Sequence, residues 1–137
     1  MLWANGGNIT VNGDVTGSGT AKIDGAATLE FAGASSAGTT FDMGAAGTLK
    51  LDLAALFTGT VSGFAQGDKL DLVDIAMMNA TSMNYAVSQD GSGGTLTVTD
   101  GTHTANIGLL GQYDPAGFQA TTDGDHGTMI TYTHHTV

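Results

Sequence analysis

The first half of this chain repeats a short alternating segment at a nearly constant spacing. Apolar residues alternate with Thr, Lys, Asp or Glu, and Gly, Asp or Asn closes each segment. Segments begin at residues 20, 28, 40, 48, 58 and 69, so alternate starts are 20, 20, 18 and 21 residues apart. Alternation with a period of two is typical of a strand that buries one face. Two such strands per repeat predict an all-β chain with a short β-solenoid of about 20 residues per coil over residues 1–72.

Coils of this kind bury their apolar faces by stacking on their neighbours. The side chains expected inside are Ile23, Leu29, Phe31, Phe41, Met43, Leu49, Leu51, Leu53, Val61, Leu70 and Leu72. A β-sandwich, with strands roughly 8 to 12 residues apart, has the same local signature and remains the alternative.

The regular spacing ends after residue 72, and residues 73–137 predict a β-rich capping region continuous with the coils. Residues 73–80 are expected to form one or two helical turns that carry Ile75, Met77 and Met78 inward. A cap with a different packing protects the open end of a coil from edge-to-edge association.

Further strands are expected within the cap. Residues 85–88 and 128–133 alternate like strands, and residues 95–109 predict a hairpin about a two-residue Asp100-Gly101 turn. Tyr113 and Phe118 are expected to be packing residues around a loop that contains Pro115.

The charge balance limits the partners. The chain has 13 acidic residues, three lysines and no arginine, for a net charge of -10, and it has no cysteine. Phosphate binding needs clustered Lys and Arg, so nucleic acid is disfavoured, whereas cations are attracted. No apolar run approaches the ~20 residues of a spanning helix, so membrane insertion is not expected. Without cysteine the fold must be stabilised by stacking rather than by disulfides.

Two stretches carry a resemblance to secreted bacterial proteins. Residues 61–75, VSGFAQGDKLDLVDI, resemble the segment that closes the β-roll of RTX proteins of the serralysin type. Residues 94–113 and 123–130 are similar to the end units of large repeat-containing surface proteins of proteobacteria. The first 56 residues resemble autotransporter-like β-helical passengers in style. The resemblance implies an extracellular module of a long secreted or surface-attached protein.

Calcium is the cofactor that the acidic residues suggest. Hard cations bind several oxygens at once, and Gly-bearing turns add backbone carbonyls. The candidate ligands are Asp68, Asp71, Asp74, Asp123 and Asp125. The RTX calcium repeat G-G-x-G-x-D-x-U-x has no intact copy, and the nearest stretch, residues 44–52, places Lys50 where a carboxylate is wanted. Solvated turn carboxylates are the alternative interpretation.

Other chemistry has weaker support. The chain lacks the G-x-S-x-G, H-E-x-x-H, Walker and dinucleotide motifs, and it has one glutamate, Glu30. Four histidines can in principle gather around a transition metal, although two of them lie in the C-terminal tail. Threonine-rich strand faces suit carbohydrate or ice recognition, but Thr is also a common solvent-facing strand residue.

These observations predict a non-enzymatic structural module of a secreted or cell-surface bacterial protein of adhesin or RTX type. The alternatives are a calcium- or carbohydrate-binding surface module and a subunit of an extracellular filament. The expected partners are flanking domains of a longer chain, or a second copy that stacks on an open coil end at residues 3–15.

Overall fold

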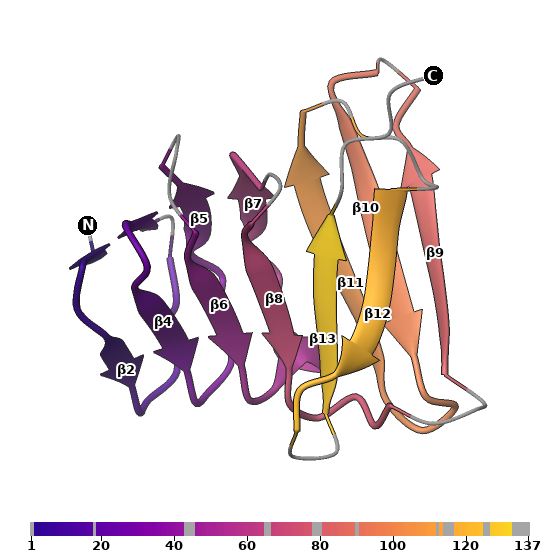
Figure 1. Ribbon diagram of the computed structural model, residues 1–137, viewed down its shortest axis with the longest axis horizontal. Helices are drawn as coiled ribbons and strands as arrows, with labels where there is room; N and C mark the ends of the chain where they lie inside the picture. Colours follow the sequence, from indigo (N-terminus) through magenta and orange to yellow (C-terminus); the bar gives the residue numbers. More distant parts are fainter. Residues whose placement is uncertain are drawn as a thin grey trace.

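The computed structural model describes residues 2–17, 19–42, 46–64, 67–77, 81–89, 91–111, 113, 117–124 and 127–132. Its strands form two facing sheets (Figure 1). In chain order the elements are β1 (Leu2–Asn5), β2 (Ile9–Val11), β3 (Thr20–Asp24), β4 (Thr28–Phe31), β5 (Gly38–Phe41), β6 (Thr48–Leu51), the 3₁₀ helix η1 (Ala54–Leu56), β7 (Thr60–Ser62), β8 (Lys69–Leu72), β9 (Ser82–Val87), β10 (Gly93–Thr99), β11 (Thr104–Leu110), β12 (Phe118–Thr122) and β13 (Thr128–Tyr132).

The first eight strands wind as a solenoid, which confirms the predicted fold class. Odd-numbered strands β1, β3, β5 and β7 pair in parallel in one sheet, and even-numbered strands β2, β4, β6 and β8 do so in the other. In the second sheet Ile9 pairs with Leu29, Leu29 with Leu49, and Leu49 with Leu70, a step of 20, 20 and 21 residues. The observed step therefore matches the period read from the sequence.

The predicted interior largely matches the observed core. Columns of stacked side chains run along the coils, for example Phe31, Leu51 and Leu72, each at most 1% exposed. The prediction that Leu53 lies inside is wrong, because this residue is 39% exposed. Strand β6 ends at Leu51 and the chain turns into η1, so the alternation no longer applies at Leu53. Met43 lies outside the described residues.

The cap extends both sheets instead of covering their ends. In the seven-stranded sheet, β11 pairs in parallel with β7, and β10 and β9 follow in antiparallel order. In the six-stranded sheet, β13 pairs antiparallel with β8, and β12 follows. Apolar residues of the coils and of the cap therefore form one continuous core between the sheets.

An aromatic cluster fills the space between the sheets in the cap. It consists of Tyr85, Tyr113, Phe118 and Tyr132, with neighbouring ring centroids 4.9 to 6.1 Å apart. The packing role predicted for Tyr113 and Phe118 is confirmed. Strands β1 and β12 are additional elements that the sequence pattern did not indicate.

Two local predictions in the cap are wrong. Residues 73–77 form turns and a bend rather than helix, and Met77 is 37% exposed, although Ile75 is fully buried as expected. The hairpin exists, but Thr99 pairs with Thr104, so its loop has four residues rather than two. Met78 and Pro115 lie outside the described residues.

Candidate functional site

The predicted calcium ligands do not converge in the structure. Asp68 is 1% exposed, and its Oδ1 accepts the backbone N–H of Gly47 at 3.3 Å. The two oxygens of Asp74 accept the N–H groups of Ala54 and Ala55 at 2.9 and 3.3 Å. Both carboxylates therefore tie a coil to the coil before it.

The remaining members of this set lie elsewhere. Asp71 stands between Lys50 and Met129 on the six-stranded sheet. Asp123 lies beyond β12, where its Oδ1 accepts the N–H of Gly127 at 2.9 Å, and Asp125 lies outside the described residues. Over the part of the chain that the structure describes, no three His, Asp or Glu side chains are grouped to hold a metal.

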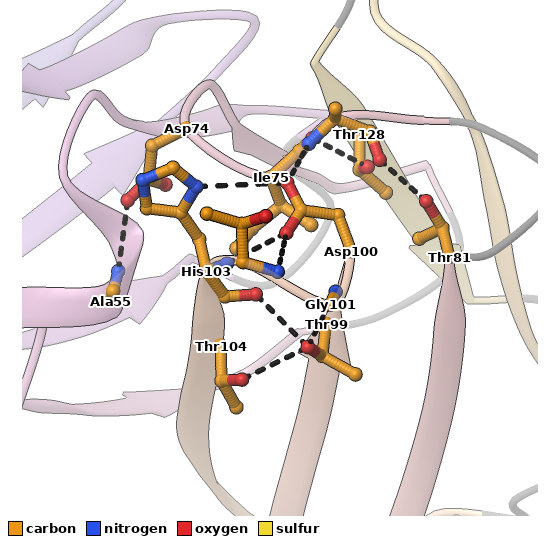
Figure 2. A network of polar contacts seen from close by, with 12 residues as sticks. Ala55, Asp74, Ile75, Thr81, Thr99, Asp100, Gly101, His103, Thr104 and Thr128 are labelled. Atoms are coloured by element: carbon orange, nitrogen blue, oxygen red, sulfur yellow. Dashed lines mark hydrogen bonds and ion pairs between the residues drawn. The ribbon is translucent and has the colours of Figure 1, made fainter.

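A buried aspartate in the hairpin loop organises the junction between solenoid and cap (Figure 2). Asp100, 9% exposed, accepts three backbone N–H groups, from His103 at 2.7 Å, Thr102 at 2.8 Å and Ala76 at 2.9 Å. The first two contacts close the loop on itself. The third binds the loop to the segment that leaves the solenoid, 24 residues earlier in the chain.

Residues 74–76 of this exit segment form hydrogen bonds with both the solenoid and the cap. Asp74 binds back to η1, the carbonyl of Ile75 accepts the Thr128 hydroxyl at 2.8 Å, and the carbonyl of Ala76 accepts the Thr81 hydroxyl. Figure 2 shows these contacts meeting around Ile75. We call Asp74, Ile75, Ala76, Asp100 and Thr128 the junction latch, because together they join η1 of the solenoid to strands of both sheets in the cap.

The electrostatics of Asp100 suit a structural role. The backbone N–H groups of His103, Ala76 and Thr102 hold the pKa of this carboxyl well below its usual range. The His103 imidazole Nδ1 lies 3.7 Å from Oδ2, with half of its side chain exposed. Because a carboxylate with a low pKa and three committed donors is a weak base, this pair is poorly suited to proton transfer.

Sequence reasoning missed this site. The sequence pattern predicts Asp100 to be a hairpin-turn residue, and an aspartate whose side chain accepts the N–H groups two and three residues later is a common turn motif. Nothing in the sequence pattern links it to Ala76, because that contact depends on how β8 leads into β9.

Within residues 61–75, Gly63 and Phe64 pack closely against Phe41 of β5. Gly63 has φ +72°, and a Cβ there would lie 2.2 Å from the Phe41 carbonyl oxygen. Phe64 packs on Phe41 with ring centroids 5.6 Å apart, and its carbonyl accepts the Tyr113 hydroxyl at 2.6 Å. Burial raises the pKa of Tyr113 to about 12. This segment closes the last coil and also anchors an aromatic residue of the cap.

A second carboxyl cluster lies on the outer face of the six-stranded sheet. Lys50 Nζ lies 3.9 Å from Glu30 Oε2, and the two residues pair across β4 and β6. Asp52 follows β6, where burial and a hydrogen bond with Glu30 raise its pKa to about 6. Both burial and the neighbouring Glu30 carboxyl disfavour the ionised form of Asp52.

An open hollow of about 230 Å³ lies on the seven-stranded sheet, where β7 meets the cap. Its lining residues are Thr60, Ala86, Ser88, Ser92, Gly93, Gly94, Thr95, Gly108, Leu109 and Leu110. As far as the described residues define it, the lining has hydroxyl and backbone groups but no ionisable side chain.

Comparisons with known proteins add no identification. No protein-family profile, curated protein or solved structure matches this chain. Among the described residues, no helix is long and apolar enough to cross a membrane.

Proposed function

We propose that this chain is a non-enzymatic structural module of a secreted or cell-surface bacterial protein of adhesin or RTX type. The coils supply length, and the antiparallel strands of the cap end the stack. The junction latch is the observation that carries the proposal, because Asp74 binds the exit segment to η1, while Asp100 and Thr128 bind the same segment to the two sheets of the cap.

Two further features support this role. The polar groups of the corners, Asp68 and Asp74 among them, accept N–H groups of an adjacent coil. The absence of cysteine and the net charge of -10 fit a surface protein that is stabilised by stacking. The resemblance of residues 61–75 to RTX closing segments points to the same location.

Single-molecule pulling on the ends of the chain tests the role. A spacer should resist extension and then release its coils one at a time, each freeing about 70 Å of chain for its 20 or so residues. Asp100→Ala should lower the force at which the cap separates. A chain that extends smoothly, without steps, would overturn the structural role.

A further inference from the structure

The open hollow on the seven-stranded sheet contains a glycine that the fold does not require. Gly108 lies inside β11, where it pairs with Thr60 of β7 and with Thr95 of β10, and all three residues line the hollow. A Cβ on Gly108 would meet only the Thr60 methyl group, at 3.4 Å. Gly93 and Gly94 differ, because a Cβ there would lie 2.2 and 2.5 Å from a backbone carbonyl oxygen. Glycine inside a strand weakens it and often marks a place where a ligand approaches the backbone.

Two threonine hydroxyls stand on either side of this glycine. Thr60 and Thr95 are exposed, and within the part of the chain that the structure describes their hydroxyls have no hydrogen-bond partner. Elsewhere on the same face hydroxyls are paired, as Thr97 is with the side-chain amide oxygen of Asn106 at 2.9 Å. The strands of Thr60 and Thr95 are two spacings, or about 10 Å, apart. The hollow therefore offers two hydroxyls to a ligand that lies over Gly108.

The strands around the hollow are uncharged. The chain has a net charge of -10, and β3, β4, β6 and β8 each contain Lys, Asp or Glu, but β7, β9, β10 and β11 contain no charged residue. An ionic ligand would find no opposite charge here, and an anion would also be repelled by the chain as a whole. An apolar ligand would bury the two threonine hydroxyls without hydrogen bonds, which is unfavourable. A neutral ligand rich in hydroxyl groups avoids both costs.

We propose that this hollow binds one hexose unit of an uncharged glycan, whose hydroxyl groups exchange hydrogen bonds with Thr60 and Thr95. Its volume of about 230 Å³ is below the roughly 300–1,000 Å³ of sites for drug-sized ligands, which suits a single sugar ring. Leu110, which also lines the hollow and is 50% exposed, offers an apolar contact to the C–H groups of the ring. This inference goes beyond the proposed structural role and does not rest on it.

Hexasaccharides that differ in charge separate this ligand from other occupants. The neutral probes are cellohexaose, maltohexaose and mannohexaose, the anionic probe is the hexamer of galacturonic acid, and the cationic probe is the hexamer of glucosamine. Amide chemical shifts of the whole chain, followed by NMR during titration, provide the measurement. We expect at least one neutral probe to shift the amides of Thr60, Thr95 and Gly108 saturably, whereas the charged probes leave these three amides unchanged.

Substitutions with matched controls place the site. Gly108→Val fills the hollow and should weaken binding at least about tenfold. Gly38→Val should not, because a Cβ on Gly38 also adjoins Thr60, 3.6 Å from its hydroxyl oxygen, but Gly38 does not line the hollow. Thr95→Val removes one hydroxyl at nearly constant shape and should weaken binding about fivefold. Thr97→Val, on the same strand, should leave binding unchanged.

Unchanged amides at about 10 mM of every neutral probe would overturn the inference. Shifts of the three amides by a charged probe alone, or neutral binding that Gly108→Val leaves intact, would do so as well. If Gly108→Val does not fold, the comparison of Thr95→Val with Thr97→Val decides the outcome. Smooth extension in the pulling experiment leaves this result untouched, so the two proposals fail separately.

Discussion

The solenoid and the cap bury the same kind of apolar face in different ways. Within the solenoid, a strand pairs with strands about 20 residues earlier or later in the chain, as in the pairing of Leu29 with Ile9 and Leu49. Within the cap, strands pair as hairpins with close neighbours in the chain, such as Thr99 with Thr104. Short loops are easier to close than whole coils. A coil therefore depends on what lies beside it, whereas a cap hairpin brings its own partner.

The substitutions with the largest expected effect test whether the solenoid and the cap unfold together or separately. Leu49 in the solenoid and Leu96 in the cap are both fully buried in the common core. Replacing either by Ala should cost about 2–5 kcal/mol of unfolding free energy. Because β7 pairs with β11 and β8 with β13, we expect either variant to lower the melting temperature of the whole molecule.

Intrinsic fluorescence separates the two regions in this experiment. The single tryptophan, Trp3, lies in the first coil, and the three tyrosines, Tyr85, Tyr113 and Tyr132, all lie in the cap. Coincident tryptophan and tyrosine transitions would confirm one cooperative unit, and Leu53→Ala, at an exposed position, should leave both unchanged. If Leu49→Ala shifts the tryptophan transition alone, the two regions unfold independently.

A smaller effect is expected where the two regions are joined. Asp100→Ala removes the acceptor of three backbone N–H groups, one of them across the junction, and should lower the melting temperature by about 5–10 °C. Asp123→Ala is the matched change, because Asp123 also accepts a backbone N–H, from Gly127 in its own loop. It should cost at most a few degrees. Equal losses of melting temperature in the two variants would show that the bond from Asp100 to Ala76 stabilises the molecule no more than a bond within a loop does.

The sequence allowed the repeated half to be predicted better than the joints. The period of the coils follows directly from alternation and spacing, and the Asp100-Gly101 pair located the hairpin. The exposure of Leu53, the helix η1 and the bond from Asp100 to Ala76 could not be predicted in the same way. Each of them depends on how the chain leaves a coil, and several different turns satisfy the same local pattern.

The pH dependence should differ between the two regions because their carboxyls are shifted in opposite directions. The pKa of Asp52 rises from 3.8 to about 6 on folding, so the folded state binds its proton more tightly than the unfolded state. Its cost to stability therefore grows as pH rises from about 4 to 6 and is fully present above that window. The pKa of Asp100 is lowered, so its contribution is present at neutral pH and is lost on acidification.

Asp52→Asn should consequently raise the melting temperature at pH 7.5 by roughly 1–4 °C and have little effect at pH 4. An amide at this position can still donate to Glu30 but carries no charge beside it. Asp100→Asn should lower the melting temperature at pH 7.5. Thermal melts of both variants across this pH range provide the measurement, and a destabilising Asp52→Asn at neutral pH would contradict the assignment.

Calcium should produce the smallest effect. The oxygens of Asp68 and Asp74 that a cation needs already accept N–H groups of the preceding coil, and Asp71 lies beside Lys50. Millimolar calcium should therefore shift the melting temperature by less than about 2 °C relative to sodium chloride of equal ionic strength, since screening of the net negative charge is common to both salts. A saturable rise of several degrees that magnesium does not reproduce, and that Asp71→Asn abolishes, would instead establish a calcium site. The last coil would then be stabilised by a bound ion as well as by stacking on its neighbour. It would depend less on neighbouring coils, and in this respect it would differ less from the cap.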